Sequence, residues 1–248
     1  MTSKLQETSK LKAASKLKDW VAYYDSPHSI YVNALHRDVH YATIADEIAR
    51  YVPSPSAAVL DYGCGEALHA DRIAAAAGRL MLADAAPSVR SHLAERFKEN
   101  PKITVVSAER AATMPDRSFD LVVLHSVSQY LSGDEFDRVG ALFRRLLKPN
   151  GLFLLGDVVP HEVPAVSDAA ALLRFAKANG FLLAALTGLV RTVFSDYWRL
   201  RTRIGLTRYG EAEMTARLTK LGFTATRAPV NIGHISSRMT FLARPAAG

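Results

Sequence analysis

Cysteine is almost absent from this chain of 248 residues, in which Cys64 is the single example. One cysteine excludes a disulfide framework and a zinc ribbon, and it agrees with a reducing compartment. Long apolar runs are missing too, since the most apolar segment, residues 181–190, is about half of the roughly 20 residues that cross a bilayer. The first 20 residues are rich in lysine and lack the apolar centre of a secretory signal. We therefore predict a cytoplasmic protein without a membrane span.

Acidic residues are scarce at the two ends of the chain, whose formal net charge is +7. Residues 1–20 hold five lysines and two acidic residues (+3), and residues 171–248 hold 12 basic and three acidic residues (+9). Residues 21–170 hold 14 basic and 19 acidic residues (−5). A basic chain invites a nucleic-acid partner, but here the middle of the chain is acidic and no RNA-binding module is recognisable. Nucleic acid is therefore a disfavoured partner.

Apolar segments alternate with helix-forming segments from residue 57 onward, which predicts a parallel sheet covered on both faces. Strands are expected at residues 57–61, 80–84, 103–106, 121–125, 152–159, 223–227 and 238–243, and helices at residues 10–24, 37–51, 68–77, 89–97, 132–148 and 214–221. Apolar, arginine-rich helical sequence interrupts this pattern at about 165–209. We predict an α/β doubly wound fold with an N-terminal helical cap (1–52), a main domain (53–248) and a helical insertion (about 165–209).

A glycine-rich turn follows the first expected strand, in the segment VLDYGCGEA at residues 59–67. Glycines allow the backbone to approach a ligand closely, and an acid about 20 residues further on is placed to bind ribose hydroxyls. Asp84 ends the second expected strand, 19 positions after Gly65. Leu68 stands where a dinucleotide motif has its third glycine, which disfavours NAD and FAD. No Gly-Lys-Ser/Thr follows, so a P-loop is excluded.

Four segments together resemble the successive motifs of the class I S-adenosylmethionine-dependent methyltransferases of the small-molecule type. They are VLDYGCGEA, LADAAPSV, SAERAATMPDRSFDLVVLHSVSQYL and LLKPNGLFLLGDVV. The resemblance covers roughly residues 57–159, with residues 211–244 also in register. It implies a Rossmann-like, mostly parallel seven-stranded sheet with an antiparallel last strand, and S-adenosylmethionine as the cofactor.

The resemblance also implies which positions contact the cofactor, from its methionine half to its adenine. These are Asp61, Gly63, Cys64, Gly65, Asp84, Ala85, Ala108, Glu109 and His125. Asp84 would hold both ribose hydroxyls, and His125 would present its backbone carbonyl. Two positions depart from the family pattern: Ala67 replaces a third glycine, and Ser107 replaces an acid that contacts the adenine amino group, for which Glu109 is the weak substitute. Cys64 is expected to pack rather than to act as a nucleophile, because no histidine partner is evident.

No catalytic base is assigned by the sequence, and the candidates are Tyr24, His28, Gln129, Asp157 and His161. Tyr24 and His28 lie in the segment of residues 23–31, which either covers the methyl acceptor or fixes the preceding helix to the hydrophobic core. The other three follow the fourth and fifth expected strands, at the edge where open α/β sheets bind ligands. Two further histidines, His36 and His40, have the spacing of metal ligands on a helix. No third ligand accompanies them, and no metal is predicted.

The insertion offers an apolar surface bordered by arginines, with Phe181, Leu186, Phe194 and Trp198 among its apolar residues. It is either a helical lid, a homodimer interface or a surface for an acidic or lipid-like acceptor. The predicted function is methyl transfer from S-adenosylmethionine to a small or amphiphilic acceptor, which releases S-adenosylhomocysteine. The alternatives are a cofactor-binding regulatory protein without transfer, and a lipid methyltransferase peripheral to the membrane.

Overall fold

Seven strands form one mixed sheet in the order β3-β2-β1-β4-β5-β7-β6 in the computed structural model, which describes residues 17–26, 30–162, 165–193, 199 and 202–246. The first five strands pair in parallel, and β7 runs antiparallel to both of its neighbours, β5 and β6. The predicted doubly wound sheet with an antiparallel last strand is therefore confirmed. The strands are β1 (Ala58–Tyr62), β2 (Arg79–Asp84), β3 (Ile103–Ser107), β4 (Phe119–His125), β5 (Leu147–Val158), β6 (Phe223–Arg227) and β7 (Met239–Pro245).

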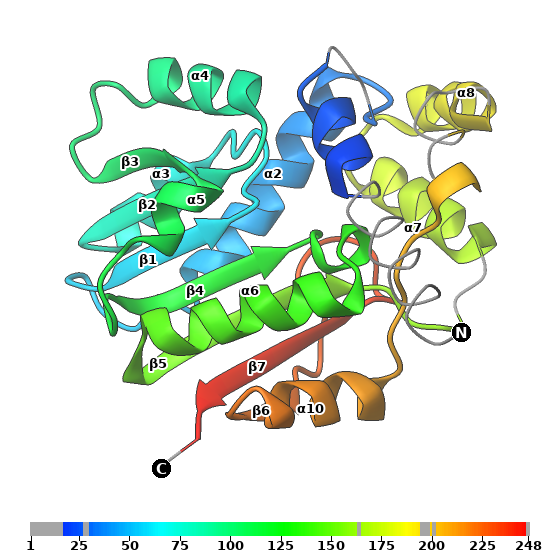
Figure 1. Ribbon diagram of the computed structural model, residues 1–248. Helices are drawn as coiled ribbons and strands as arrows, with labels where there is room; N and C mark the ends of the chain where they lie inside the picture. The colour runs from blue at the N-terminus through cyan, green and yellow to red at the C-terminus, as the bar shows by residue number, and fades with distance from the viewer. Residues whose placement is uncertain (1–16, 27–29, 163–164, 194–198, 200–201, 247–248) are drawn as a thin grey trace.

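Helices cover both faces of this sheet (Figure 1). They are α2 (Ala34–Ala49), α3 (Ala70–Ala76), α4 (Pro87–Arg96), α5 (Ala108–Ala112), α6 (Gly133–Leu146), α7 (Ala165–Ala178), α8 (Leu182–Val193) and α10 (Glu211–Lys220), with a 3-10 turn η1 (Ser128–Tyr130). Residues 17–24 form a further helix, dark blue in Figure 1, which lies with α7 and α8 on the side toward which β4 points. The elements outside the regular alternation thus gather beyond the carboxyl ends of the parallel strands.

Successive residues of the central strands alternate between two hydrophobic clusters, one on each face of the sheet. Leu60 and Val122 belong to the cluster that contains residues of α6 and α10, whereas Val59 and Leu121 belong to the one that contains residues of α2, α3 and α4. Side chains on a strand point to opposite faces with a period of two, so a strand buried on both faces must be apolar throughout. This requirement explains the uninterrupted apolar runs of the sequence.

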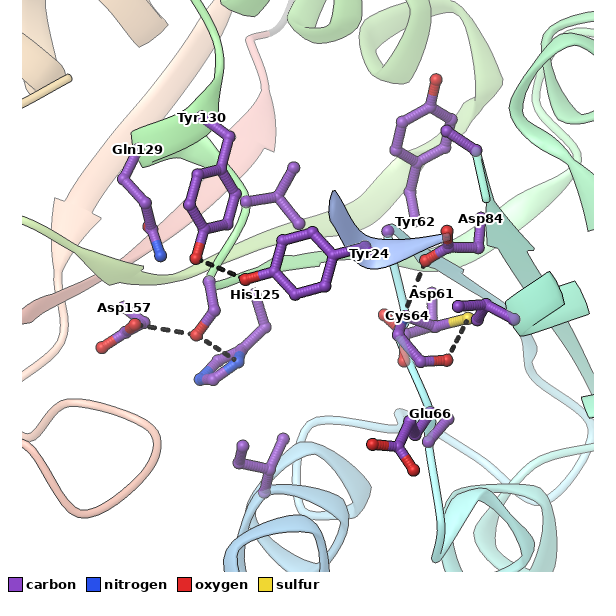
Figure 2. Close-up of a pocket in the computed structure, with 18 of the residues that line it drawn as sticks. Tyr24, Asp61, Tyr62, Cys64, Glu66, Asp84, His125, Gln129, Tyr130 and Asp157 are labelled. Carbon is purple, nitrogen blue, oxygen red and sulfur yellow. Dashed lines mark hydrogen bonds between the residues drawn. The ribbon is translucent and has the colours of Figure 1, made fainter. Parts of the chain in front are cut away.

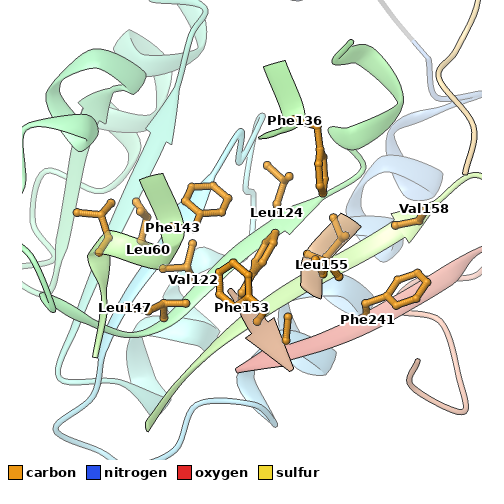
Figure 3. Close-up of a cluster of buried hydrophobic side chains, with 14 of the residues drawn as sticks. Leu60, Val122, Leu124, Phe136, Phe143, Leu147, Phe153, Leu155, Val158 and Phe241 are labelled. Carbon is orange, nitrogen blue, oxygen red and sulfur yellow. The ribbon is translucent and has the colours of Figure 1, made fainter. Parts of the chain in front are cut away.

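Aromatic rings form the centre of the cluster under α6 and α10 (Figure 3). The ring centroids of Phe143 and Phe153 lie 5.1 Å apart at an interplanar angle of 69°, and the centroid of Phe223 lies 5.7 Å from that of Phe153. The first pair is edge-to-face and the second is tilted, and aromatic pairs in favourable geometry add roughly 0.5–1.5 kcal/mol to the stabilisation from buried area. The packing therefore ties α6, β5 and β6 together.

Most element boundaries lie within a few residues of the prediction. The capping box expected at Ser132 and Glu135 is present, since each side chain accepts from the other residue's backbone N–H. The helix predicted at 37–51 begins earlier, at Ala34, because the Asn33 side chain accepts from the His36 N–H and caps it. The short helix α5 was not predicted, and Ser107 caps it in the same way.

The insertion contributes α7 and α8, a helical pair whose own small core includes Phe181 and Ala185. Three leucines of α8 remain exposed, Leu182, Leu183 and Leu186. The predicted insertion residues Phe194 and Trp198 lie outside the described residues, as do residues 10–16 of the first expected helix. Within the described part of the chain, no helix has the length and apolar character needed to cross a bilayer.

Replacing Phe153 by alanine should lower the free energy of unfolding by about 3–5 kcal/mol, because the deletion leaves a cavity among fully buried rings. Urea unfolding followed by circular dichroism measures this loss. Leu183→Ala is the control, since this side chain is 79% exposed and the substitution should cost less than about 0.5 kcal/mol. Equal losses for the two variants would contradict the assignment of the core.

Candidate active site

A cavity of about 650 Å³ lies at the carboxyl ends of the parallel strands, a size typical of small-molecule sites. It is lined by every residue that the sequence predicted along the cofactor, namely Asp61, Gly63, Cys64, Gly65, Asp84, Ala85, Ala108, Glu109 and His125. Of the predicted catalytic candidates, Tyr24, Gln129 and Asp157 also line it. The fold therefore brings segments from distant parts of the sequence to one cavity.

The turn after β1 has a left-handed backbone at three alternate positions. Gly63, Gly65 and Ala67 have φ angles of 73°, 57° and 39°. A Cβ at Gly63 would lie 2.6 Å from Cγ2 of Val127, so this position needs glycine for its space as well as for its φ. Ala67 keeps the left-handed conformation that the family's third glycine would adopt freely, at a cost in strain.

The Asp84 carboxylate connects this turn to the start of α4 (Figure 2). Its Oδ2 accepts from the Gly65 N–H at 3.0 Å, and its Oδ1 accepts from the Ala86 N–H at 2.9 Å. Burial raises the pKa of Asp84, and these two amide donors oppose the rise. The carboxylate is thus held at the cavity wall in a fixed orientation.

Asp61 is a buried carboxyl without a hydrogen-bond partner for its side chain among the described residues. Burial, with a smaller contribution from the charge of Asp84, raises its pKa to about 7. A ligand that carries a positive group or hydrogen-bond donors would restore its ionised form. Two acidic side chains on one wall therefore prepare the cavity for a donor-rich ligand.

Cys64 lies between the two glycines with its thiol buried. Burial raises its pKa well above the usual range, and the nearby Asp61 and Asp84 add to the rise. The thiolate, which is the nucleophilic form, is therefore disfavoured. This chemistry agrees with the predicted packing role.

The departure at Ser107 has a local structural explanation. Its hydroxyl accepts from the Arg110 N–H at 3.2 Å and so caps α5. Glu109, on the first turn of α5, lines the cavity, and its pKa is lowered by hydrogen bonds from its own backbone and from Ser107. An ionised carboxylate therefore remains at this end of the cavity even though the expected acid is absent.

A chain of polar side chains lies across the cavity, at the ends of β4 and β5 (Figure 2). Ser126 Oγ donates to Asp157 Oδ2 at 2.7 Å and lies 3.1 Å from His125 Nδ1. His125 Nε2 lies 3.3 Å from the carbonyl oxygen of Ile232. Ser126 and Asp157 have φ angles of 57° and 60°, unusual for residues other than glycine.

Tyr24 and Tyr130 lie between the two sides of the cavity, with their hydroxyl oxygens 2.7 Å apart (Figure 2). Trp20 packs against Tyr130 at a ring-centroid distance of 4.5 Å. The N-terminal helix therefore both lines the cavity and packs on the core, and its contact with an acceptor stays a prediction.

Residues 60–155 match a family model described as a methyltransferase domain. No curated protein sequence matches the chain significantly. Among solved structures, the DhpI–SAH complex aligns with a TM-score of 0.60 at 17% identity, over 94% of this chain and 98% of that one. Magnesium protoporphyrin IX methyltransferase (ChlM) from Synechocystis PCC 6803, solved with bound SAH, aligns with a TM-score of 0.57 at 14% identity, over 94% and 95% of the two chains.

Residues 60–155 are thus similar to a methyltransferase domain, and the chain has the fold of the two methyltransferase structures solved with bound SAH. The family match covers β1 to β5, whereas the structural likeness extends over nearly the whole chain and is a likeness of fold. The resemblance stated from the four sequence segments is therefore confirmed.

Among the described residues, one predicted catalytic candidate, His161, is absent from the lining of the cavity. His161 is exposed, and its Nε2 lies 2.8 Å from Glu213 Oε2 at the start of α10. The chain turns away from the sheet edge after Val159, which the position of His161 alone did not indicate. His28 lies outside the described residues.

Sequence reasoning missed a cluster of aromatic and histidine rings on the wall formed by α2, α7 and the loop before β7. His36, His40 and His234 have ring centroids 5.6–6.2 Å apart, and His234 stacks on Phe175 at 4.3 Å. The spacing of His36 and His40 was visible in the sequence, but nothing local pointed to His234. Among the described residues, no group of ligating side chains is arranged to hold a metal.

The contribution of Asp61 to stability should fall as pH rises from about 4 to about 7. Asp61 has a native pKa of about 7 against 3.8 in the unfolded chain, so this group binds more protons in the native state over this range. On going from pH 4.5 to pH 7.5, the unfolding free energy of Asp61→Asn should therefore change in a more favourable direction than that of the wild type. Urea titrations at the two pH values measure it, with Glu99→Gln, an exposed carboxylate, as the charge-matched control. An identical pH dependence in Asp61→Asn would contradict the buried, unpaired state of Asp61.

Proposed function

We propose that this protein transfers a methyl group from S-adenosylmethionine to a small or amphiphilic acceptor and releases S-adenosylhomocysteine. The observation that carries the proposal is a single cavity with two chemically different sides (Figure 2). One side has the glycine turn with Asp61 and Asp84, and the other has Asp157, Gln129 and Tyr130. A protein that only bound the cofactor would not need the second side.

The residues on the first side fit the cofactor chemically. Asp84 is placed to accept hydrogen bonds from ribose hydroxyls, and the unpaired Asp61 carboxylate suits the ammonium group of the methionine half. Ala85 and Ala108 are small enough to leave room for the adenine, with Glu109 beside it. Gly63 and Gly65 let the backbone approach the ligand closely.

The chemistry asks for orientation more than for a protein nucleophile. When bound, S-adenosylmethionine supplies a methyl group that is already activated on a sulfonium. The chain's task is to hold an acceptor in line with that methyl group, and good orientation can contribute about 7–11 kcal/mol. The aromatic rings of Trp20, Tyr24 and Tyr130 form an apolar cover over the cavity and exclude water from it.

Calorimetric titration should show binding of S-adenosylmethionine to the wild-type protein. Asp84→Ala should weaken this binding by about 10–150-fold, because hydrogen bonds to a charged group contribute about 1.5–3 kcal/mol. The control is Asp46→Ala, which removes an exposed carboxylate paired with Arg72 and should leave the affinity unchanged. The proposed function would be wrong if the wild type failed to bind S-adenosylmethionine.

A further inference from the structure

We propose that Asp157, acting with Ser126 and His125, accepts the proton of an acceptor hydroxyl, and that the acceptor is a flat, uncharged, hydroxylated compound. This inference rests on the proposed methyltransferase function and adds to it the class of acceptor and the destination of its proton. It is carried by a proton count across three contacts, by backbone strain at two of the residues and by the chemistry of the surrounding wall.

The series of hydrogen bonds that runs from the Ile232 carbonyl through His125 and Ser126 to Asp157 has three contacts, and each contact requires one proton. The carbonyl of Ile232 cannot donate, so the first contact needs a proton on His125 Nε2. The second needs a proton on His125 Nδ1 or Ser126 Oγ, and the third needs one on Ser126 Oγ or Asp157 Oδ2. A neutral imidazole, a hydroxyl and a carboxylate together provide two. This series of hydrogen bonds can therefore take up one further proton, which the hydroxyl group of a methyl acceptor can supply.

The backbone holds Ser126 and Asp157 at this position at a cost. Both residues are left-handed, with φ angles of 57° and 60°, a conformation that costs on the order of 1–3 kcal/mol outside glycine and persists where the surroundings enforce it. The Asn231 side chain accepts from the Asp157 N–H at 3.2 Å, and Thr240 Oγ1 donates to the same Asn231 oxygen at 2.8 Å. The side chains of these two strained residues hydrogen-bond to each other, and strain retained at such a pair is typical of a functional site.

Two oxygen atoms near these side chains have no hydrogen-bond donor among the described residues. One is Gln129 Oε1, which is buried. The other is Asp157 Oδ1, since Ser126 binds the other oxygen of this carboxylate. A ligand hydroxyl is a donor that the free oxygen of Asp157 can accept from. The wall therefore selects a ligand with a hydrogen to donate.

The adjoining wall is flat, and its two charged residues, Arg238 and Asp168, offset each other in an ion pair at 2.8 Å. His234 stacks on Phe175 with an interplanar angle of 17°, and Tyr31 packs against His40 at a centroid distance of 5.4 Å. Burial lowers the pKa of His36 to about 4 and that of His40 well below its usual value, so these imidazoles are neutral. Neutral rings beside the Asp157 carboxylate disfavour an anionic acceptor and leave planar apolar surface for an aromatic one.

The transfer balances without any further reactant. The acceptor O–H bond breaks and its proton moves to the Asp157 carboxylate, while the acceptor oxygen forms a bond to the methyl carbon. The sulfur–methyl bond breaks, and its electron pair stays on sulfur. The proton is shared along Asp157, Ser126 and His125 until it exchanges with solvent after the products leave.

The test uses the full chain saturated with S-adenosylhomocysteine and three probes: 2-naphthol, 2-naphthoate and 2-naphthylmethylammonium. By calorimetry, 2-naphthol should bind about tenfold or more tightly than either ionic probe, as expected for a hydrogen bond to a carboxylate in a neutral aromatic wall. Tighter binding of an ionic probe, or no binding of 2-naphthol, would overturn the acceptor class. Failure to bind S-adenosylhomocysteine itself would instead overturn the proposed function.

The proton-accepting role is tested by turnover of 2-naphthol with S-adenosylmethionine. Asp157→Asn should lower kcat by about 10²–10⁴-fold, the usual contribution of a general base, without changing the affinity for S-adenosylhomocysteine. Ser126→Gly removes the hydroxyl at a left-handed position that suits glycine, so it should lower kcat about tenfold while the unfolding temperature changes little. Asp116→Asn, an exposed carboxylate paired with Arg145, is the matched control. Transfer at the wild-type rate in Asp157→Asn, or no transfer to bound 2-naphthol by the wild type, would refute the role.

Discussion

The active cavity depends on one carboxylate, that of Asp84, and on the two backbone amides that it accepts from. One amide belongs to the glycine turn after β1, and the other to the residue that precedes α4. Arg90 fixes the same corner from the opposite side, because its guanidinium donates to the carbonyl oxygens of Asp84 and Ala85. Two backbone hydrogen bonds, from the Gly63 and Cys64 N–H groups to the Ala83 carbonyl oxygen, hold the glycine turn to the same strand end. The positions of Asp61, Gly63 and Gly65 along the cavity follow from these contacts.

The grouping of the residues proposed to hold the cofactor could be predicted from the sequence, because they are local to strand ends. Parallel strands bring their carboxyl ends to one edge, so the ends of expected strands suffice to group Asp61, Asp84 and His125. The fold followed for a similar reason, since strands buried on both faces have uninterrupted apolar sequence. The small differences at Asn33 and Ser107 arose from side-chain caps, which shift a helix boundary without changing the apolar pattern.

The acceptor side could not be predicted in the same way, because it is assembled from segments with no shared periodicity. His234 lies in a loop, Phe175 lies on the insertion, and His36 lies on a helix before the first strand. Their proximity depends on how α7 docks, and Arg238, paired with Asp168 at 2.8 Å, fixes that docking through a long-range contact. His161 shows the converse, since closeness to a strand end in sequence did not bring its side chain to the cavity.

The pairing of β5 with β7 shifts register between Leu155 and Val158, and Asp157 lies within that shift. Its backbone N–H is satisfied by the side chain of Asn231 and not by β7. Asp157, the residue that we propose faces the acceptor, therefore has little part in the backbone hydrogen bonding that joins the last two strands to the sheet. Asn231 instead connects the backbone at Asp157 to β7, because its side-chain oxygen also accepts from Thr240 Oγ1. The shift in register therefore turns one side chain toward the cavity while the paired strands on either side keep their alignment.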